Sequence, residues 1–247
     1  MKHGHRILAV VPARSGSKGI PDKNMQEIAG RSLIALTGEV LSAPACSWID
    51  RRIISTDSER YAEEGRRHGL DAPFLRPPEL SSDTAGAVET LCHAVQEMER
   101  RDGVTYDVIL IVEPTCPFRQ PEDINGVVDL MAQTAAGSAV SVSRVDTKFH
   151  PHKVLRVNDA SLISFYEEAG AGVKQRQSLE PLFYRNGACY ALSRACLMDE
   201  RRIFTTSTRA YLVERPLLNI DEPEEIELAR YYAETRHLPV GHNKEPS

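Results

Sequence analysis

Short apolar runs alternate with amphipathic stretches along the first 145 residues of the chain. Apolar runs rich in β-branched residues predict strands at 7–11, 51–57, 72–76, 106–112 and 138–145. Amphipathic spacing predicts helices at 32–42, 59–68, 86–101 and 122–136. Strands that alternate with helices of this length indicate βαβ units, so we expect an α/β fold with a mostly parallel sheet flanked by helices. The run at 106–112 is the most apolar and is the predicted central strand.

The alternation lapses at residue 146 and resumes near 188. An interruption of this length predicts a subdomain or an oligomer contact, because long structureless loops are uncommon inside compact domains. A strand at 188–192 and an apolar strand end at 217–221, followed by a helix, continue the pattern. We therefore divide the chain into a main domain (1–145 and 186–236), an inserted arm (146–185) and a polar, frayed tail (237–247).

The composition narrows the class of protein. Of the 247 residues, 41% are hydrophobic and 26% are charged, as in soluble globular proteins. The formal net charge of -5 disfavours a nucleic-acid-binding protein. We expect neither a membrane span nor a signal peptide, because no apolar run is long enough and the first residues lead directly into a strand. Five cysteines without a C-x-x-C pair indicate reduced thiols and a cytoplasmic location.

Polar side chains follow the predicted strands at the positions where an open parallel sheet binds ligands. They are Arg14, Asp57, Arg76 and the segment 113–119. Because the carboxyl ends of parallel strands lie at one edge of the sheet, we expect a binding site there.

The loop after the first strand reads Pro-Ala-Arg-Ser-Gly-Ser-Lys-Gly-Ile-Pro-Asp-Lys-Asn. Its two glycines allow a close turn, and Arg14, Lys18 and Lys23 supply positive charge. A strand, a glycine loop and then a helix form an arrangement that cradles phosphate. The loop has neither Walker A spacing nor a G-x-G-x-x-G pattern. A surface turn with solvated lysines is the alternative interpretation.

The wider pattern Pro-Ala-Arg-x-Gly-Ser-Lys-Gly-Ile-Pro-x-Lys-Asn resembles the signature loop of the cytidylyltransferases that make CMP-activated acidic sugars, the CMP-sialic (acylneuraminic) acid synthetases and their relatives. The resemblance implies a Rossmann-like fold of the nucleotide-diphospho-sugar transferase type and a loop that holds the triphosphate of CTP. Arg-Pro-x-Glu-Leu, from Arg76, is similar to a segment that lies on the nucleotide in that family. The nucleotide-binding residues implied are Ala13, Arg14, Ser17, Lys18, Lys23, Arg76 and Ala87.

The tip after the central strand, Glu-Pro-Thr-Cys-Pro-Phe-Arg, resembles the family's Gln-Pro-Thr-Ser-Pro-Leu-Arg. The family's Gln faces the sugar, so a carboxylate at Glu113 would repel an acidic group and favour hydroxyl or amine donors. In the family, an arm lysine and an Arg-Gln pair approach the acidic sugar across a dimer interface, and an Asn-Gly-Ala turn lies against the substrate. The substrate-binding residues implied are Glu113, Thr115, Arg119, Lys153, Arg176, Gln177 and Asn186. The inserted arm is then a dimerisation subdomain, with a homodimer or larger homo-oligomer as the assembly, and a solvated charged arm is the alternative.

Near the C-terminus, Asn219-Ile220-Asp221 resembles the family's Asp-Ile-Asp, whose two aspartates serve magnesium. The i, i+2 spacing on a strand places both side chains on one face. Asn219 removes one charge, but Mg²⁺ needs only one or two protein carboxylates beside phosphates and water. We therefore expect Asp221 and Asn219 to bind Mg²⁺ as the cofactor. A helix N-cap at Asp221, with Glu224 in the first turn, is the alternative.

Taken together, the resemblance of these segments, in the same order, to that family implies a cytidylyltransferase that joins CTP to an acidic, nonulosonic sugar and releases pyrophosphate. Arg14 and Lys18 would stabilise the leaving pyrophosphate, and Asp221 would receive the hydroxyl proton. A cytidylyltransferase for another acid, such as a phosphonate, and a sugar nucleotidyltransferase with another base are alternatives that Glu113 keeps open. A non-catalytic nucleotide-binding protein is a third, and the presence of Arg14, Lys18 and Asp221 argues against it.

Overall fold

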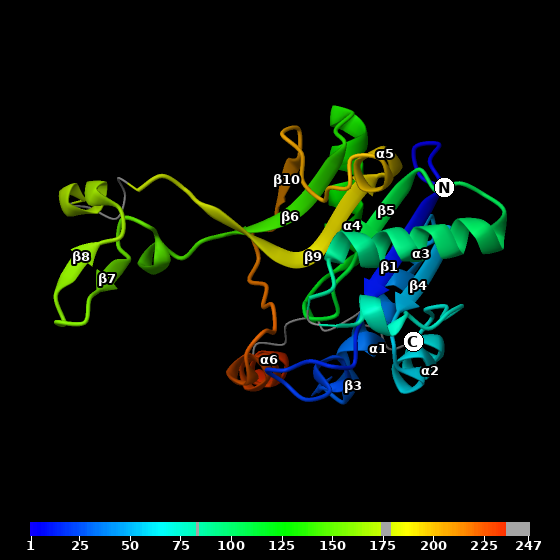
Figure 1. Cartoon of the computed structure of the whole chain (residues 1–247), viewed down its shortest axis with the longest axis horizontal. Coiled ribbons are helices and arrows are strands. Elements are labelled where there is room, and N and C mark those ends of the chain that lie inside the picture. The colour runs from blue at the N-terminus through cyan, green and yellow to red at the C-terminus, as the bar shows by residue number, and fades with distance from the viewer. Residues whose placement is uncertain (83, 174–178, 236–247) are drawn as a thin grey trace.

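The computed structural model describes residues 1–82, 84–173 and 179–235, which form a helix-flanked sheet and a projecting arm (Figure 1). The main sheet has the strand order β10-β6-β9-β5-β1-β4. Its strands are β1 (Ile7–Pro12), β4 (Arg51–Ser55), β5 (Val108–Ile111), β6 (Ser138–Arg144), β9 (Phe183–Ser193) and β10 (Arg209–Leu212). Strand β1 pairs in parallel with β4 and β5, β10 pairs in parallel with β6, and β9 is antiparallel to β5 and β6. The mostly parallel sheet is thus confirmed.

Alternate residues of β1 face two different hydrophobic cores, as the period-two geometry of a strand requires. Ile7, Ala9 and Val11 lie in one core, and Leu8 and Val10 lie in the other, all fully buried. The first core is covered by α1 (Leu33–Ser42), α2 (Glu59–Arg67) and α4 (Pro121–Thr134). The second core is covered by α3 (Ala87–Asp102) and the short α5 (Arg194–Met198), and α3 crosses the front of the sheet in Figure 1.

The helix α6 (Pro223–Thr235) packs beside the loop that follows β1. Its Ile226 and Ala229 are buried together with Ile20, from that loop, and Phe118. The small hairpin of β2 (Glu27–Ile28) and β3 (Arg31–Ser32) contacts the same helix. This packing brings residues 219–221 back to the carboxyl edge of the sheet, 200 residues along the chain from the loop.

The predicted strands differ from the observed ones at three places. Residues 72–76 form no strand, because the neighbouring Asp71 makes a single bridge to Ile53 and the prolines at 73 and 77 cannot donate to a ladder. Residues 217–221 are also not a strand. Strand β10 was missed because it is an exposed edge strand with a short Arg-Ala-Tyr-Leu sequence. The four helices of the first half are confirmed, each to within two residues.

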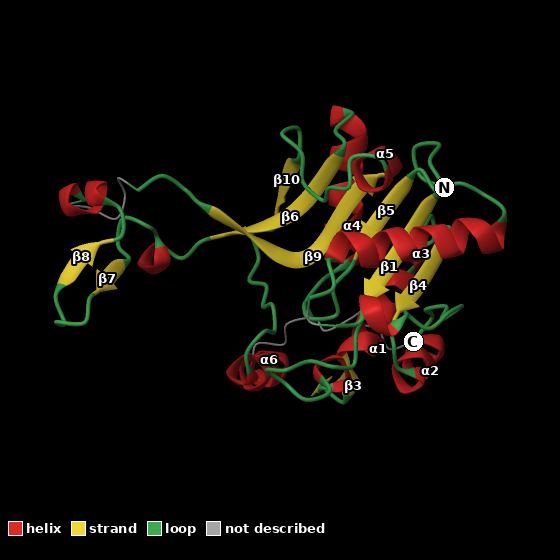
Figure 2. Ribbon diagram, in the orientation of Figure 1, coloured by secondary structure: helices red, strands yellow, loops and turns green. Residues whose placement is uncertain are grey.

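The arm is carried by a two-stranded ribbon in which β6 and β9 continue beyond the sheet (Figure 2). A β-bulge between Val140 and Val142 marks the place where the pairing shifts its register. The arm holds the hairpin of β7 (Leu155–Val157) and β8 (Ile163–Phe165), flanked by the 3₁₀ helices Thr147–Phe149 and Glu168–Gly172. No helix in the described ranges is long and apolar enough to cross a membrane. The predicted tail, 237–247, lies outside the described residues.

Candidate active site

Asp57, at the carboxyl end of β4, fixes the backbone of the glycine loop. Its carboxylate accepts hydrogen bonds from the amide of Ser15, at 2.8 Å, and from the Ser15 hydroxyl, at 3.0 Å. From the far side of the loop, Asn24 Nδ2 donates to the carbonyl of Arg14 at 3.2 Å. The backbone is therefore held by neutral and acidic groups, while the Lys18 side chain is exposed and the Arg14 side chain lines a cavity.

Asp22 ties the second half of the loop to α2. It has a left-handed backbone (φ 50°), and its carboxylate accepts from Arg60 Nη1 at 2.8 Å and from the Tyr61 hydroxyl at 3.1 Å. The hydrogen bond from Arg60 lowers the pKa of Asp22 below its ordinary value. The ion pair thus stabilises the turn that leads into Lys23.

Lys23 joins the loop to the C-terminal carboxylate. Its Nζ lies 2.9 Å from Asp221 Oδ1. The Lys23 side chain is 17% exposed, whereas that of Asp221 is 66% exposed. The Asp221 carboxylate therefore faces solvent while its Oδ1 is in an ion pair with Lys23. The loop and the acidic residue therefore border one site, as the sequence predicted.

A relay of hydrogen bonds connects Asp221 to the tip after β5. Thr115 Oγ1 donates to Asn219 Oδ1 at 2.7 Å, and Asn219 Nδ2 donates to Asp221 Oδ2 at 2.8 Å. Glu113 is the next acidic group: a Cβ placed on Gly187 would lie 2.9 Å from both Glu113 Oε2 and Asn219 Oδ1. Gly187 also has φ 71°, so both the space and the backbone conformation call for glycine there.

A cavity of about 390 Å³ opens beside these residues. Its charged lining comes from Arg14, Arg76, Glu113 and Arg185, and its other walls include Ala87, Leu91, Tyr190 and Phe204. Three cations around a mainly apolar floor suit an anionic ligand with a planar, apolar part.

Arg76 is held rigidly at the rim of this cavity. It is 6% exposed, its Nε donates to Ser55 Oγ at 3.1 Å, and its Nη2 donates to the Ser55 carbonyl. Burial lowers the pKa of Arg76 to about 10, which still leaves the guanidinium charged at neutral pH. The structure thus brings Arg76, Arg14 and Ala87 of the predicted nucleotide-binding set to one cavity.

Arg119 does not line the cavity, and its predicted contact with substrate stays a prediction. It is 1% exposed, and its guanidinium donates to the carbonyls of Glu113, Gly187 and Ala188 and to the Thr37 hydroxyl. These acceptors belong to β9, α1 and the tip after β5. Arg119 is therefore a scaffold that fixes the loops around the site, because a buried guanidinium needs all its donors satisfied.

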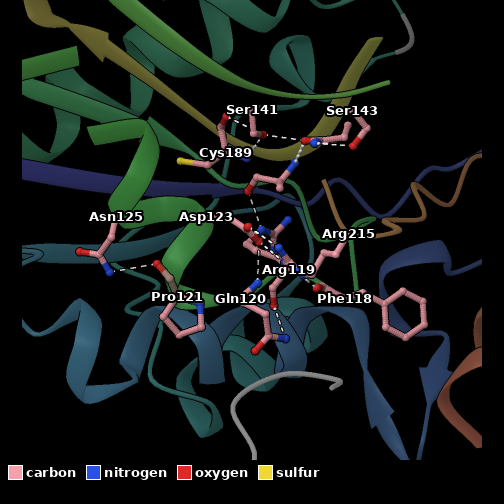
Figure 3. Close-up of polar contacts among 12 residues, drawn as sticks. Phe118, Arg119, Gln120, Pro121, Asp123, Asn125, Ser141, Ser143, Cys189 and Arg215 are labelled. Atoms are coloured by element: carbon pink, nitrogen blue, oxygen red, sulfur yellow. Dashed lines mark hydrogen bonds and ion pairs between the residues drawn. The ribbon is translucent and has the colours of Figure 1, made fainter. Parts of the chain in front are cut away.

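Asn186 is likewise buried rather than exposed to substrate. It is 1% exposed, its Oδ1 accepts from the Ser141 hydroxyl at 2.6 Å, and its Nδ2 donates to Ser143 Oγ at 3.0 Å. Ser141 also bonds the backbone of Cys189 (Figure 3). The Asn186 side chain therefore bonds to β6 beside the β-bulge of the ribbon and fixes the turn at Gly187. The described structure shows a structural role for Asn186, and its predicted contact with substrate stays a prediction.

The structure also places three further predicted residues, whose assigned roles stay predictions. Ala13 is fully buried and its amide donates to the Ser55 carbonyl, so only its carbonyl can meet a nucleotide. Ser17 is half-buried in the loop. Thr115 is 9% exposed and its hydroxyl positions Asn219, as described above.

The arm residues lie away from the cavity of their own chain (Figure 1). Lys153 is exposed, between a 3₁₀ turn and β7. Arg176 and Gln177, the other predicted arm ligands, lie outside the described residues. Their assignment to the substrate stays a prediction.

Sequence reasoning did not assign Arg185, Tyr190 and Phe204 to the site. Arg185 packs over the Phe204 ring, with its guanidinium carbon 5.2 Å from the ring centroid. The position of Arg185 directly before Asn-Gly-Ala was the one sequence feature that could have assigned it to the site. Nothing in the sequence distinguished Tyr190 and Phe204 from ordinary core residues. Folding brings them to the cavity from β9 and from the loop after α5.

Comparison with known proteins identifies the family. A family model described as "Cytidylyltransferase" matches residues 8–238. The chain belongs to the cytidylyltransferase family. This family membership confirms the resemblance recognised in the loop sequence, and it makes the chain a nucleotidyltransferase.

Several relatives of this cytidylyltransferase carry more specific names. It is 31% identical to a CMP-N,N'-diacetyllegionaminic acid synthase of Legionella pneumophila, over 87% of this chain and 90% of that protein. It is 30% identical to an N-acylneuraminate cytidylyltransferase of Escherichia coli O18:K1:H7, over 91% of this chain and 51% of that protein. The chain thus spans about half the length of the N-acylneuraminate cytidylyltransferases it matches.

Solved structures confirm the fold. A CMP:2-keto-3-deoxy-manno-octonic acid synthetase complexed with CTP superposes with a TM-score of 0.68 at 16% identity, covering 94% of this chain and 99% of that one. A 4-diphosphocytidyl-2C-methyl-D-erythritol synthase from Anaerococcus prevotii gives a TM-score of 0.62 at 13% identity, covering 93% and 96%. The cytidylyltransferase therefore has the Rossmann-like fold predicted from its strands and helices.

The donor set beside Lys23 fits a hard divalent cation. Asp221 offers a largely exposed carboxylate, Asn219 an amide oxygen, and Glu113 a second carboxylate across Gly187. Within the described ranges no three histidine, cysteine, aspartate or glutamate side chains form a ready-made metal cluster. Mg²⁺ does not need one, because it keeps several waters and binds through one or two carboxylates together with substrate phosphates.

Proposed function

We propose that this cytidylyltransferase transfers CMP from CTP to an acidic, nonulosonic sugar and releases pyrophosphate. The observation that carries the proposal is the shared border of the cationic loop and the C-terminal carboxylate, where Lys23 Nζ and Asp221 Oδ1 lie 2.9 Å apart. The names of the relatives support the acceptor class, since three of them refer to legionaminic, neuraminic and pseudaminic acids.

The chain's own residues would act by positioning and by charge. CTP carries about four negative charges at neutral pH, because the last pKa of a terminal phosphate is near 6. Arg14, Lys18 and Lys23 supply countercharge from the loop, and the cavity edged by Arg76 and Ala87 would take the cytidine. In this arrangement Lys18, which is exposed at the loop tip, reaches the β- and γ-phosphates that leave as pyrophosphate.

The reaction is an in-line displacement. The sugar hydroxyl oxygen forms a bond to the α-phosphorus, and the bond between that phosphorus and the bridging oxygen of pyrophosphate breaks. Asp221 is placed to accept the hydroxyl proton, because its carboxylate is exposed and oriented by Asn219 and Lys23. Asp221 and Asn219 would also hold Mg²⁺, which when bound neutralises charge on the phosphates.

A substrate panel tests the proposal. The purified chain is incubated with CTP, ATP, GTP or UTP, each with neuraminic-, legionaminic- or pseudaminic-type acids or with a phosphonate, with and without Mg²⁺. We expect pyrophosphate and a CMP-sugar with CTP, a nine-carbon acid and Mg²⁺. Product from a phosphonate but from no sugar acid would contradict the proposed acceptor, and product from another nucleotide would contradict the proposed cytosine base. CTP binding without turnover on any acceptor would favour a non-catalytic protein.

We further propose a homodimer in which the arm contacts a second copy. The arm exposes apolar side chains that a monomer would leave in water, among them Val157 at 67%, Leu162 at 66% and Ile163 at 69%. Lys153 lies on the same arm and would approach the partner's acidic sugar. Sedimentation equilibrium should give twice the chain mass, and Ile163→Asp should give a monomer, whereas a monomeric wild type would refute the proposal.

A cytoplasmic location is part of the proposal. All five cysteines are buried and none forms a disulfide, which is typical of proteins from a reducing compartment. Fractionation of the source cells with an antibody against the chain would test it.

A further inference from the structure

A buried histidine, His150, lies in the projecting arm, most of which is open to solvent. Its side chain is 3% exposed. Among the described residues of 146–182, only Gly170 is also buried. Because buried polar side chains normally have hydrogen-bonding partners, the contacts of this imidazole indicate what holds it in place.

The two ring nitrogens of His150 differ in their contacts. Nδ1 accepts a hydrogen bond from the backbone amide of His152 at 3.2 Å, and it can accept only as an unprotonated nitrogen. In the neutral imidazole the proton therefore lies on Nε2. Nε2 is buried, and no described residue accepts a hydrogen bond from it. His150 also lines a cavity of about 620 Å³ at the root of the arm, where water can satisfy this N–H.

His150 holds the turn that follows it through its backbone as well. Its carbonyl accepts from the amide of Lys153 at 2.7 Å and from the amide of Val154 at 3.2 Å. With the bond from His152 to Nδ1, three consecutive amides donate to this one residue. The turn is therefore closed around the buried imidazole, and Lys153 lies within it.

The other side of the turn packs against the 3₁₀ helix Glu168–Gly172. His152 Nε2 lies 2.9 Å from Glu167 Oε2. A Cβ on Gly170 would lie 2.3 Å from the His152 carbonyl oxygen, so the two backbones are in close contact. Lys153 itself is exposed, and no described residue pairs with its ammonium group. The arm thus presents an available lysine on a turn that is fixed from both sides.

We propose that His150 is a positioning residue that acts through Lys153 on the acid acceptor. Nδ1 of the neutral imidazole fixes the turn, and the turn directs the lysine towards an acceptor held by a second copy of the chain. Because a lysine side chain is long and flexible, its charge can be placed accurately only if its backbone is fixed. This inference rests on the proposed function, in which Lys153 approaches the acidic sugar.

Two variants of His150 separate the roles of its two nitrogens in the full-length chain. His150→Asn keeps an acceptor, Oδ1, near the position of Nδ1, whereas His150→Gln keeps an N–H donor near the position of Nε2. Initial rates are measured with CTP and with the acid that wild type uses in the substrate panel. We expect His150→Gln to raise the KM for the acid about tenfold to a hundredfold, as Lys153→Ala does, and to leave the KM for CTP unchanged. His150→Asn should stay within about threefold of wild type, because the bond to the His152 amide is kept.

A double variant tests whether His150 acts through Lys153. In the Lys153→Ala background, His150→Gln should raise the KM for the acid by less than about twofold, because the lysine that it positions is already absent. His5→Asn is the matched control, since His5 is exposed near the N-terminus, far from the arm (Figure 1). It should change neither KM. Sedimentation equilibrium should give each variant the mass of wild type.

Nitrogen-15 NMR of the imidazole provides a readout independent of turnover. The His150 signals are those that disappear in His150→Asn. At neutral pH they should show a proton on Nε2 and none on Nδ1.

Several results would overturn the inference. They are a proton on Nδ1, equal losses in His150→Asn and His150→Gln, full multiplication of the two effects in the double variant, and a lower mass for His150→Gln. An unchanged KM for the acid in Lys153→Ala would also overturn it, while leaving the proposed transfer of CMP intact. If wild type forms no CMP-sugar from any acid, the proposed function fails, and with it the action of His150 on an acceptor.

Discussion

The glycine loop after β1 and the tip after β5 are both polar segments at the carboxyl edge of the sheet, yet they use their cations in opposite ways. In the loop, the backbone is held by Asp57 and Asn24, and Lys18 is left exposed. In the tip, the side chain of Arg119 is buried and itself holds backbone carbonyls of the tip and of β9. The guanidinium of Arg119 is thus committed to the fold, whereas the ammonium of Lys18 faces solvent.

Arg215, whose side chain is partly exposed, also uses its charge to hold neighbouring groups next to the tip. Its guanidinium donates to both oxygens of Asp123 and to the Phe118 carbonyl (Figure 3). Asp123 also accepts from the Gln120 amide at 2.8 Å, which caps α4. Arg119, which is buried, and Arg215, which is partly exposed, thus fix the tip, whereas Lys18 in the loop opposite is exposed.

The largest expected effect is on stability, from the scaffold arginine. Arg119→Ala should lower the free energy of unfolding by about 3 kcal/mol or more, because several buried acceptors lose their donor at once. Arg119→Lys should recover little of this, since an ammonium cannot reproduce the planar fork. Urea unfolding measures both, and Arg202→Ala, at an exposed arginine, should stay within about 0.5 kcal/mol of wild type. A similar small loss for Arg119→Ala would remove the contrast between the two regions.

The loop should show the reverse behaviour. Lys18→Ala should reduce kcat by about a hundredfold to a thousandfold with the Tm unchanged, because an exposed cation that stabilises the leaving group is lost. Lys2→Ala is the control, at a lysine that pairs with Asp129 at the opposite end of the sheet, and its kcat should equal that of wild type. Near-normal turnover in Lys18→Ala would contradict its catalytic role.

Gly187 lies against Glu113 of the tip and against Asn219, so its replacement should affect both stability and turnover. Gly187→Ala should cost about 1–3 kcal/mol of stability, because alanine is strained at a positive φ. Its methyl group would also push against Glu113 and Asn219, so CTP-dependent turnover should fall by more than the stability loss explains. Urea unfolding and kcat measured on the same preparation separate the two effects. An unchanged kcat would show that the spacing of these two side chains is unimportant.

The smallest expected effect concerns pH and the anchoring of the loop. The pKa of Asp22 is lowered by Arg60, so its contribution to stability is present above the unfolded value, near 3.8, and is lost as the pH falls through the lower folded value. Asp22→Asn keeps a residue that tolerates the left-handed backbone and removes only the charge. Its Tm should lie slightly below wild type at pH 7 and approach that of wild type as the pH falls below 3.8. A constant difference across that range would mean that the charge is not responsible.

The sequence by itself determined the α/β alternation, the first four helices and the family. Buried strands and amphipathic helices leave period-two and 3.6-residue patterns that survive without any tertiary information. The cationic loop could also be predicted from the sequence, because glycines and lysines at that spacing between a strand and a helix have few structural uses. Strand β10 and the absence of a strand at 72–76 could not be predicted from the sequence. Whether an edge segment or a proline-rich segment pairs as a strand depends on the strands beside it.

Only the tertiary structure decided which polar residues face the ligand. Arg119 and Asn186 belong to motif segments, yet both are buried: Arg119 bonds carbonyls of β9, and Asn186, within β9, bonds serines of β6. Arg185, Tyr190 and Phe204 carry no motif, yet β9 and a distant loop bring them to the cavity. The proximity of Glu113 to Asn219 is likewise a fact of folding, because it joins residues 106 positions apart around one glycine. The exposure of a side chain and its contacts with distant residues depend on how the whole chain packs, so they cannot be predicted from the identity of the residue and its sequence neighbours.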